Sequence, residues 1–292
     1  MIKVPTQQIP GFYHRRIDDI VVTAISDGYL DAPMTVAYGL PTAESEQILA
    51  EACRPRIPRI SVNCFAVYSS GRLGLIETGS GNTMGPTLGF MPQNLKAAGI
   101  DIADIDTVLL THVHPDHSNG LTDDAGIARF PTAEIVVNGD EVDHWHNDAA
   151  MAKANERQRV RYFQAARTQL APYHNRLRRI TSGEVFPGVT AIPIPGHTPG
   201  HTAYLISSGK ESLLIWGDTV HIPDIQVPRP EVTMEFDSDP QKAAATRMRV
   251  FDMAATDRVL IGGMHMHFPG FGHLVRAGTG YRLLPEPWAF QV

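Results

Sequence analysis

The stretch His112-Val113-His114-Pro115-Asp116-His117 places three imidazoles and a carboxylate within six consecutive positions. It follows the run Thr-Val-Leu-Leu at 107–110, which is typical of a buried strand. Neutral imidazole and carboxylate groups are the ligands that bind zinc and its first-row neighbours. Packing gives no reason to crowd such groups at a strand end, because buried polar groups without partners are costly. The stretch therefore predicts a metal site.

Four ligands this close together do not all suit one tetrahedral ion, so the stretch favours two adjacent ions. Two ions need more ligands, and three later predicted strands are each followed by a glycine and a ligand-type residue, namely His197, Asp218 and His265. Each of these three would alone be an ordinary turn or surface residue. The complete predicted metal set is His112, His114, Asp116, His117, His197, Asp218 and His265.

The order of these seven residues resembles the metallo-β-lactamase superfamily. The resemblance implies an α/β fold, a four-layer αββα sandwich, and a binuclear centre in which the residue matching Asp218 bridges the ions. In that family, residues matching His112, His114 and His197 hold one ion, and residues matching Asp116, His117 and His265 hold the other.

Further segments resemble the methyl parathion hydrolase and lactonase branch: 85–89, 94–99, 236–239 and 265–273. This likeness implies a small neutral substrate such as a lactone, an aryl ester or an organophosphate triester. A hydroxide shared by two divalent ions is the expected nucleophile, with Asp116 and Asp218 as catalytic carboxylates. Zinc is the expected metal, and Mn, Fe or Co also suit His and Asp ligands. Homodimers are common in this branch, and the apolar segment 33–40 is a candidate interface or lid.

One departure from the superfamily concerns the surroundings of the ligands. The family often has Asp-Thr-Gly after an early strand, where this chain has Glu77-Thr78-Gly79. We expect Glu77 to orient a metal-binding histidine without binding the ion. His201 is expected to make a supporting hydrogen bond at a strand end, with a direct catalytic role as the alternative. His221 is expected to support a ligand or to line the pocket.

The predicted substrate pocket contains Met84, Trp145, Phe163 and Tyr173, with His267 near its mouth. Apolar walls of this kind suit an uncharged ligand. Core packing is the competing explanation for each of these aromatic residues. Trp145 matches a pocket aromatic of the similar hydrolases, whereas Met84 and His267 stand where those hydrolases have Phe and Pro.

Two other activities within the superfamily are compatible with the same motif. A thioesterase or β-lactamase would use the same metal residues on another acyl substrate. A mononuclear iron dioxygenase acting on persulfides would bind one iron and consume oxygen. The number of bound ions separates oxidation from hydrolysis.

Composition limits the class of partner. The chain has 292 residues and a formal net charge of −6, without a long basic tract, which argues against a nucleic-acid substrate. The first ten residues lack an apolar signal core, and no apolar stretch is long enough to span a membrane. We therefore expect a cytoplasmic protein. Cys53 and Cys64 are compatible with free thiols or with a disulfide.

Residues 1–292 are expected to form one domain, because no linker or low-complexity break divides the chain. A helical, aromatic-containing insertion is predicted at about 140–177. A second long helix is predicted to begin after Asp239-Pro240, because a capping carboxylate precedes a proline at the first helical position. Its predicted apolar face contains Ala244, Met248, Phe251 and Ala255.

Overall fold

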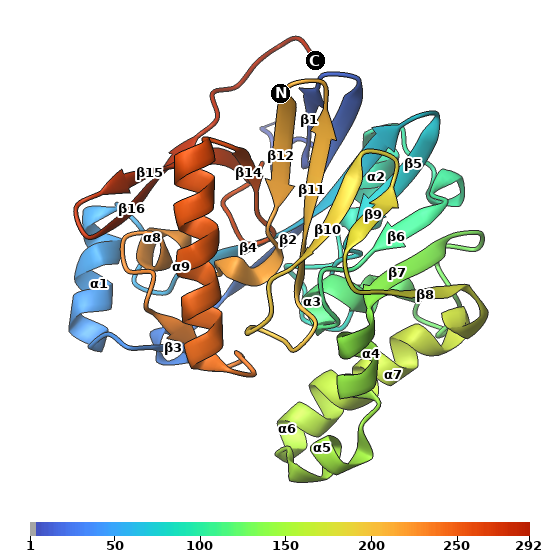
Figure 1. The fold of residues 1–292 in the computed structure, drawn as a ribbon, viewed down its shortest axis with the longest axis horizontal. Helices are drawn as coiled ribbons and strands as arrows, with labels where there is room; N and C mark the ends of the chain where they lie inside the picture. Colours follow the sequence, from blue (N-terminus) through green and yellow to red (C-terminus); the bar gives the residue numbers. More distant parts are fainter. Residues whose placement is uncertain (1–3) are drawn as a thin grey trace.

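Two seven-stranded sheets form the centre of the protein, which a computed structural model describes for residues 4–292 (Figure 1). The first sheet contains, in spatial order, β1 (Phe12–Ile17), β2 (Ile20–Asp31), β4 (Arg59–Ser69), β5 (Arg72–Ile76), β6 (Thr107–Leu109), β7 (Glu134–Asn138) and β8 (Leu177–Ile180). The second contains, in spatial order, β16 (Gly280–Pro285), β15 (Phe271–Ala277), β14 (Leu260–Gly262), β12 (Glu211–Ile215), β11 (Thr202–Ser208), β10 (Val189–Pro193) and β9 (Gly183–Phe186). A separate two-stranded sheet pairs β3 (Ala37–Tyr38) with β13 (Thr233–Met234).

Helices cover the outer faces of both sheets. The α-helices are α1 (Thr42–Glu51), α2 (Met91–Ala97), α3 (Pro115–Ser118), α4 (Gly139–Trp145), α5 (Asp148–Lys153), α6 (Glu156–Gln158), α7 (Ala165–Leu170), α8 (Pro223–Gln226) and α9 (Pro240–Asp257). Short 3-10 segments are η1 (Met34–Val36), η2 (Ile102–Asp104), η3 (Asn119–Leu121), η5 (Ala171–Arg176) and η6 (Gly217–Thr219), and η4 (Arg159–Gln164) is π-helical.

The alternation of side chains along the strands explains the four layers. Successive strand residues point to opposite faces of a sheet. In the first sheet, Ile76 and Leu109 pack against the second sheet, whereas Leu75 and Val108 pack in the cluster that includes Leu95 of α2. Both faces of these strands are buried, which matches their continuous apolar sequences. The predicted αββα sandwich is therefore confirmed.

Helix α9 covers the outer face of the second sheet and begins where the sequence predicts. The Asp239 carboxylate accepts a hydrogen bond from the Lys242 backbone N–H at 3.0 Å, so it caps the helix. The predicted apolar face is displaced, however. Met248 is 44% exposed, and the buried positions include Val250 and the fully enclosed Arg247. The periodicity of apolar residues does not predict an arginine on the inner face of the helix.

Arg247 is buried because backbone carbonyl groups satisfy its guanidinium. Its Nε donates to the Thr219 carbonyl oxygen at 2.6 Å. Its Nη1 donates to the carbonyl oxygens of Pro230 and Val232 at 2.9 and 2.7 Å. Burial lowers the pKa of Arg247 to about 10. The side chain thus ties α9 to the loop that follows β12.

Helices α4 to α7 and segment η5 connect β7 to β8 and project beyond the sheets (Figure 1). This helical region lies where the insertion was predicted. Cys53 is exposed and Cys64 is buried, and both are free thiols. Among residues 4–292, no helix combines the length and the apolar character that crossing a bilayer requires.

Replacing the α9 cap tests how much the helix contributes to stability. Asp239→Ala should lower the free energy of unfolding by about 1 kcal/mol, because the Lys242 N–H loses its acceptor. Urea titration of the metal-saturated protein measures the change. Asp257→Ala, at the other end of α9, is the matched control and should have little effect. An equal loss in both variants would contradict a capping role.

Candidate metal centre

All seven predicted ligands lie in the connections that follow strands, at one edge of the sandwich. Residues 112–117 follow β6, His197 lies between β10 and β11, Asp218 follows β12, and His265 follows β14. Strand β6 pairs in parallel with β5, and β14 pairs in parallel with β12. The carboxyl ends of parallel neighbours meet at the same edge, so residues distant in sequence become neighbours.

Asp218 occupies the middle of the group. Its Oδ2 atom lies 3.7 Å from His112 Nε2, 3.3 Å from His197 Nε2 and 3.2 Å from His265 Nε2. Its Oδ1 atom lies 3.2 Å from His117 Nε2. The carboxylate is thus placed between imidazoles from four separate positions in the chain.

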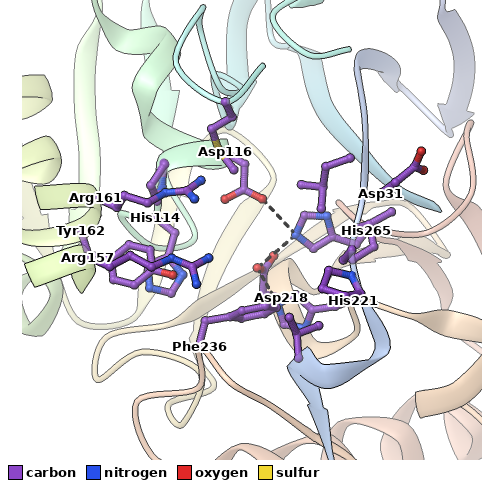
Figure 2. Close-up of a pocket in the computed structure, with 17 residues that line it drawn as sticks. Asp31, His114, Asp116, Arg157, Arg161, Tyr162, Asp218, His221, Phe236 and His265 are labelled. Atoms are coloured by element: carbon purple, nitrogen blue, oxygen red, sulfur yellow. Dashed lines mark hydrogen bonds and ion pairs between the residues drawn. The ribbon is translucent and has the colours of Figure 1, made fainter. Parts of the chain in front are cut away.

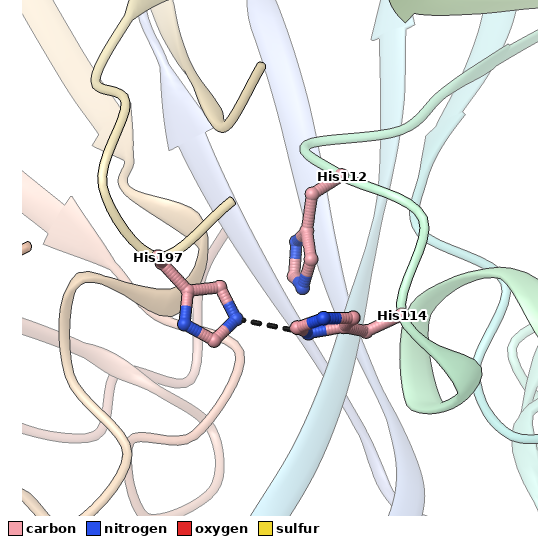
Figure 3. A group of neighbouring side chains, drawn as sticks. All are labelled: His112, His114 and His197. Carbon is pink, nitrogen blue, oxygen red and sulfur yellow. Dashed lines mark hydrogen bonds between the residues drawn. The ribbon is translucent and has the colours of Figure 1, made fainter. Parts of the chain in front are cut away.

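Asp218 lies close to members of two sets of three ligand atoms, and the atoms in each set are within 4.8 Å of one another. One set consists of His112, His114 and His197, which converge from two loops (Figure 3). The other set consists of Asp116, His117 and His265. These are the two groupings that the sequence resemblance implies. Two more sets overlap with them, Glu77 with His112 and His117, and His197 with Asp218 and His221.

Several polar atoms at the centre are buried without a hydrogen-bond partner. They include His112 Nε2, His117 Nε2 and Asp218 Oδ1. Buried polar atoms are almost always satisfied in native proteins, so these atoms require an explanation. Each is a ligand-type atom directed at the same small space. A pair of divalent cations would satisfy them, and the His and Asp donor set suits zinc and its neighbours.

The protonation states agree with this fit. Burial, together with the nearby imidazole of His117, holds the pKa of His112 well below its usual value, so the ring is neutral. Burial also opposes charge on His117, but the carboxylates of Asp218, Asp116 and Glu77 raise its pKa well above the usual value. In the absence of a metal, a proton on His117 therefore balances part of the acidic charge that a cation would balance.

The comparisons with known proteins point to one family. Residues 57–265 match the metallo-beta-lactamase superfamily. The chain belongs to this superfamily. A crystal structure of the hydrolase AbOPH, from the beta lactamase superfamily, is similar over 97% of this chain and 100% of its own, with 33% identity and a TM-score of 0.91.

Two lactonases are also similar. The dizinc quorum-quenching lactonase AidC, in complex with a product, shares 27% identity over 96% of this chain and 98% of its own, with a TM-score of 0.90. The N-acyl homoserine lactonase AttM of Azorhizobium caulinodans is 28% identical over 41% of this chain and 43% of its own. The curated relatives are matched over 41% to 63% of their own length.

Further polar contacts hold the predicted ligands in place. The Asp237 carboxylate contacts His197 Nδ1 at 2.8 Å, and the Ser61 carbonyl oxygen contacts His265 Nδ1 at 2.8 Å. Glu77 Oε2 lies 3.6 Å from His117 Nδ1, while its Oε1 accepts from the Thr111 N–H at 2.8 Å. Such contacts fix the ring orientation of metal-binding histidines. Glu77 therefore lies within reach of a predicted ligand ring.

His201 holds Asp218 through its backbone. Its Nε2 accepts from the Asp218 N–H at 2.9 Å, and its Nδ1 contacts the Ile194 carbonyl oxygen at 3.2 Å. Burial lowers the pKa of His201 to about 3, so the ring is neutral and Nδ1 carries its proton. Gly217 makes this approach possible, because a Cβ there would lie 2.3 Å from His201 Nε2. His221 contacts Asp218 Oδ2 directly, with its Nε2 at 3.0 Å.

A buried carboxylate that the sequence analysis missed joins two ligand loops. Glu141 of α4 is fully buried and accepts from the Val113 N–H at 3.0 Å and from the Gly200 N–H at 2.9 Å. It also accepts from Trp145 Nε1 at 2.7 Å. Val113 lies between two predicted ligands, and Gly200 is close to His197. No motif identifies Glu141, because its role depends on two loops that meet only in the folded chain.

A cavity of about 250 Å³ opens above the ligands (Figure 2). Met84 lines it, as predicted, and so do Pro33 and Val36 of the apolar segment 33–40. Residues of this cavity that were not predicted include Tyr162, Phe236, Arg157 and Arg161. The structure therefore combines an apolar wall with two cationic side chains.

The other predicted pocket residues lie elsewhere. Trp145 and Phe163 line a neighbouring cavity of about 260 Å³, which also touches His114. Tyr173 lies in the core instead, where its hydroxyl donates to the Leu121 carbonyl oxygen at 2.6 Å. The His267 Nε2 contacts Asp224 Oδ2 at 2.8 Å, and His267 is absent from the described lining of both cavities. Aromatic character alone does not separate core residues from pocket walls.

Replacement of Glu141 tests its positioning role. Glu141→Gln presents an amide NH₂ to backbone donors, so the loops of Val113 and Gly200 should separate. Metal affinity should fall about 10- to 100-fold. Competition with a coloured chelator measures it. Glu134→Gln removes a carboxylate from the surface pair with Arg178 and should leave the affinity unchanged. Equal affinities in all three proteins would contradict the role of Glu141.

Metal binding should release protons at neutral pH. The raised pKa values of His117 and His265 favour the protonated, positively charged rings in the metal-free protein, and a metal ligand must be deprotonated. We expect release of about one to two protons per chain. Calorimetry of zinc binding in buffers of different ionisation enthalpy measures the number. Zinc binding without proton release would contradict the charge states described above.

Proposed function

We propose that this protein is a binuclear metal-dependent hydrolase, with zinc as its metal, that cleaves uncharged ester groups in small substrates. The candidates are lactones, aryl esters and organophosphate triesters. The observation that carries the proposal is the position of Asp218, between two sets of three ligand-type atoms at the floor of a cavity. A structural metal site has closed coordination and needs no adjoining cavity.

The names of two similar proteins support an ester as the group of the substrate that reacts. AidC is described as a dizinc lactonase and is similar over 96% of this chain. AttM is named as an N-acyl homoserine lactonase. Both names indicate a cyclic ester as the substrate of those proteins. Fold similarity alone would not indicate a substrate.

Bound divalent ions would lower the pKa of a shared water and polarise the substrate carbonyl or phosphoryl oxygen. The chain itself supplies orientation and proton transfer. Asp218 is 3% exposed and its oxygens face imidazoles, so its role is to hold the two sets of ligands together. The Asp116 side chain is 15% exposed and lines the cavity. Asp116 is therefore the better placed carboxylate to pass a proton to the leaving group.

The surrounding cavity gives the substrate its orientation. Met84, Val36 and Phe236 provide apolar surface beside the ligands. The Tyr162 ring lies against that of His114, with ring centroids 4.8 Å apart and the ring planes tilted by 34°. Small-molecule sites typically combine apolar walls with a few polar groups that fix orientation. An ester with an apolar body therefore matches this arrangement.

The direct test is hydrolysis by metal-loaded protein of a lactone, an aryl ester and a phosphotriester, with elemental analysis of the same sample. We expect two ions per chain and metal-dependent turnover of at least one substrate. Asp218→Asn should lower kcat/KM by about 100-fold or more, equivalent to ~2.7 kcal/mol of transition-state stabilisation. Asp224→Asn, a carboxylate paired with Arg54 and His267, is the control and should retain activity.

Other outcomes would identify the alternatives. A content of one iron per chain, together with oxygen uptake, would indicate a dioxygenase instead of a hydrolase. Turnover of only thioesters or β-lactams would keep the metal chemistry and change the substrate class. Absence of metal-dependent turnover on the whole panel would refute the proposal.

A further inference from the structure

Two arginines reach into the cavity above the metal ligands. Arg157 belongs to α6 and Arg161 to the π-helical segment η4 that continues it. Residues four apart lie close together on a helix surface, so the two side chains leave from similar positions. Figure 2 shows both guanidinium groups extending from the side of Tyr162 towards the space between Asp116, Asp218 and His265.

The acidic groups near these arginines leave their charge largely unbalanced. Asp31, which also lines the cavity, is already paired with Arg59 at 2.9 Å. The Glu235 carboxylate is 3.9 Å from Arg157, and both side chains are about half exposed or more, so this contact is weak. Among the ion pairs of residues 4–292, none involves Arg161.

The remaining acids of the cavity are Asp116 and Asp218, which belong to the proposed metal set. Two divalent ions would more than offset these two negative charges. The loaded cavity would then be cationic at its floor and at its arginine wall, although the whole chain carries a net charge of −6. A cationic cavity in an acidic protein favours an anionic ligand.

We infer that Arg157 and Arg161 bind a carboxylate on the substrate, remote from the ester that reacts. The guanidinium group presents a planar fork of donors that matches a carboxylate. The inferred substrate is therefore an ester or lactone with an uncharged scissile group, an apolar body and a terminal acid. This inference rests on the proposed function. It narrows the proposed substrates from fully neutral molecules to those that also carry a carboxylate.

The cavity also has an apolar wall. Met84, Ile60 and Phe236 line the same cavity as the arginines and the ligands. A short aliphatic chain between the ester and the acid would cover this surface. Arg157 and Arg161 are thus specificity-determining residues, and the metal ligands act on the ester.

A pair of matched esters tests the inference. 4-Nitrophenyl hexanoate and mono-4-nitrophenyl adipate share a leaving group and differ in a terminal methyl or carboxylate. The unmodified protein should prefer the adipate. The double variant Arg157→Gln, Arg161→Gln should lower kcat/KM for the adipate by about 10- to 100-fold, mainly through KM, and leave the hexanoate within about twofold.

The chain offers a matched control on the same helical segment. Arg159 lies between the two arginines in sequence but is not part of the described cavity lining. Arg159→Gln removes one positive charge from the same segment and should change kcat/KM for neither substrate. Added salt should weaken the preference for the adipate in the unmodified protein, because screening reduces exposed electrostatic attraction.

Calorimetric binding of the products gives a second readout that does not depend on turnover. Adipate should bind more tightly than hexanoate to the unmodified protein, and the double variant should abolish this difference. If both esters are hydrolysed with equal kcat/KM in the unmodified protein, or if Arg159→Gln has the same effect as the double variant, the inference is wrong and the proposed hydrolase stands. If neither ester nor the wider panel shows metal-dependent hydrolysis, the proposed function itself fails.

Discussion

The contact between the Asp218 carboxylate and the imidazoles around it is the interaction on which the site depends. Its two oxygens lie within 3.7 Å of ring nitrogens from His112, His117, His197 and His265. Burial alone would favour the neutral acid, yet these rings hold the pKa of Asp218 well below its usual value. Three connections from both sheets must therefore be held in fixed positions around a charged group that a fourth connection carries.

The fold holds these loops with buried acids whose charge is met by hydrogen bonds. Glu141 accepts from two ligand loops and an indole, and Asp237 joins His197 to the Met234 backbone N–H at 2.8 Å. Glu77 has a positive φ of 66° and accepts from the Thr111 N–H. Non-glycine residues with positive φ are uncommon and are retained where the surroundings over-determine them. The scaffold therefore accepts local strain and buried charge next to its ligands.

The cavity above the ligands sets what can reach them. Its wall combines an apolar strip, to which segment 33–40 contributes, with arginines from the helical insertion between β7 and β8. The sandwich provides the rigid floor, and the insertion provides part of the wall. Under the proposed function, this division separates the groups that perform chemistry from those that select the substrate, a separation typical of sites placed on a common fold.

The four-layer sandwich was predicted through the resemblance to a known superfamily, whereas local patterns predicted the start of α9 and the seven residues that the structure brings together. These local signals are a capping carboxylate before proline, clustered imidazoles after a strand, and a glycine with a ligand-type residue after three later strands. Glu141, Arg247 and Arg161 were not foreseen, and Tyr173 was placed in the wrong environment. Their roles depend on which segments meet in space. A buried charge is tolerated only where distant backbone groups satisfy it. An exposed arginine is a pocket residue only when its helix directs the side chain at the ligands.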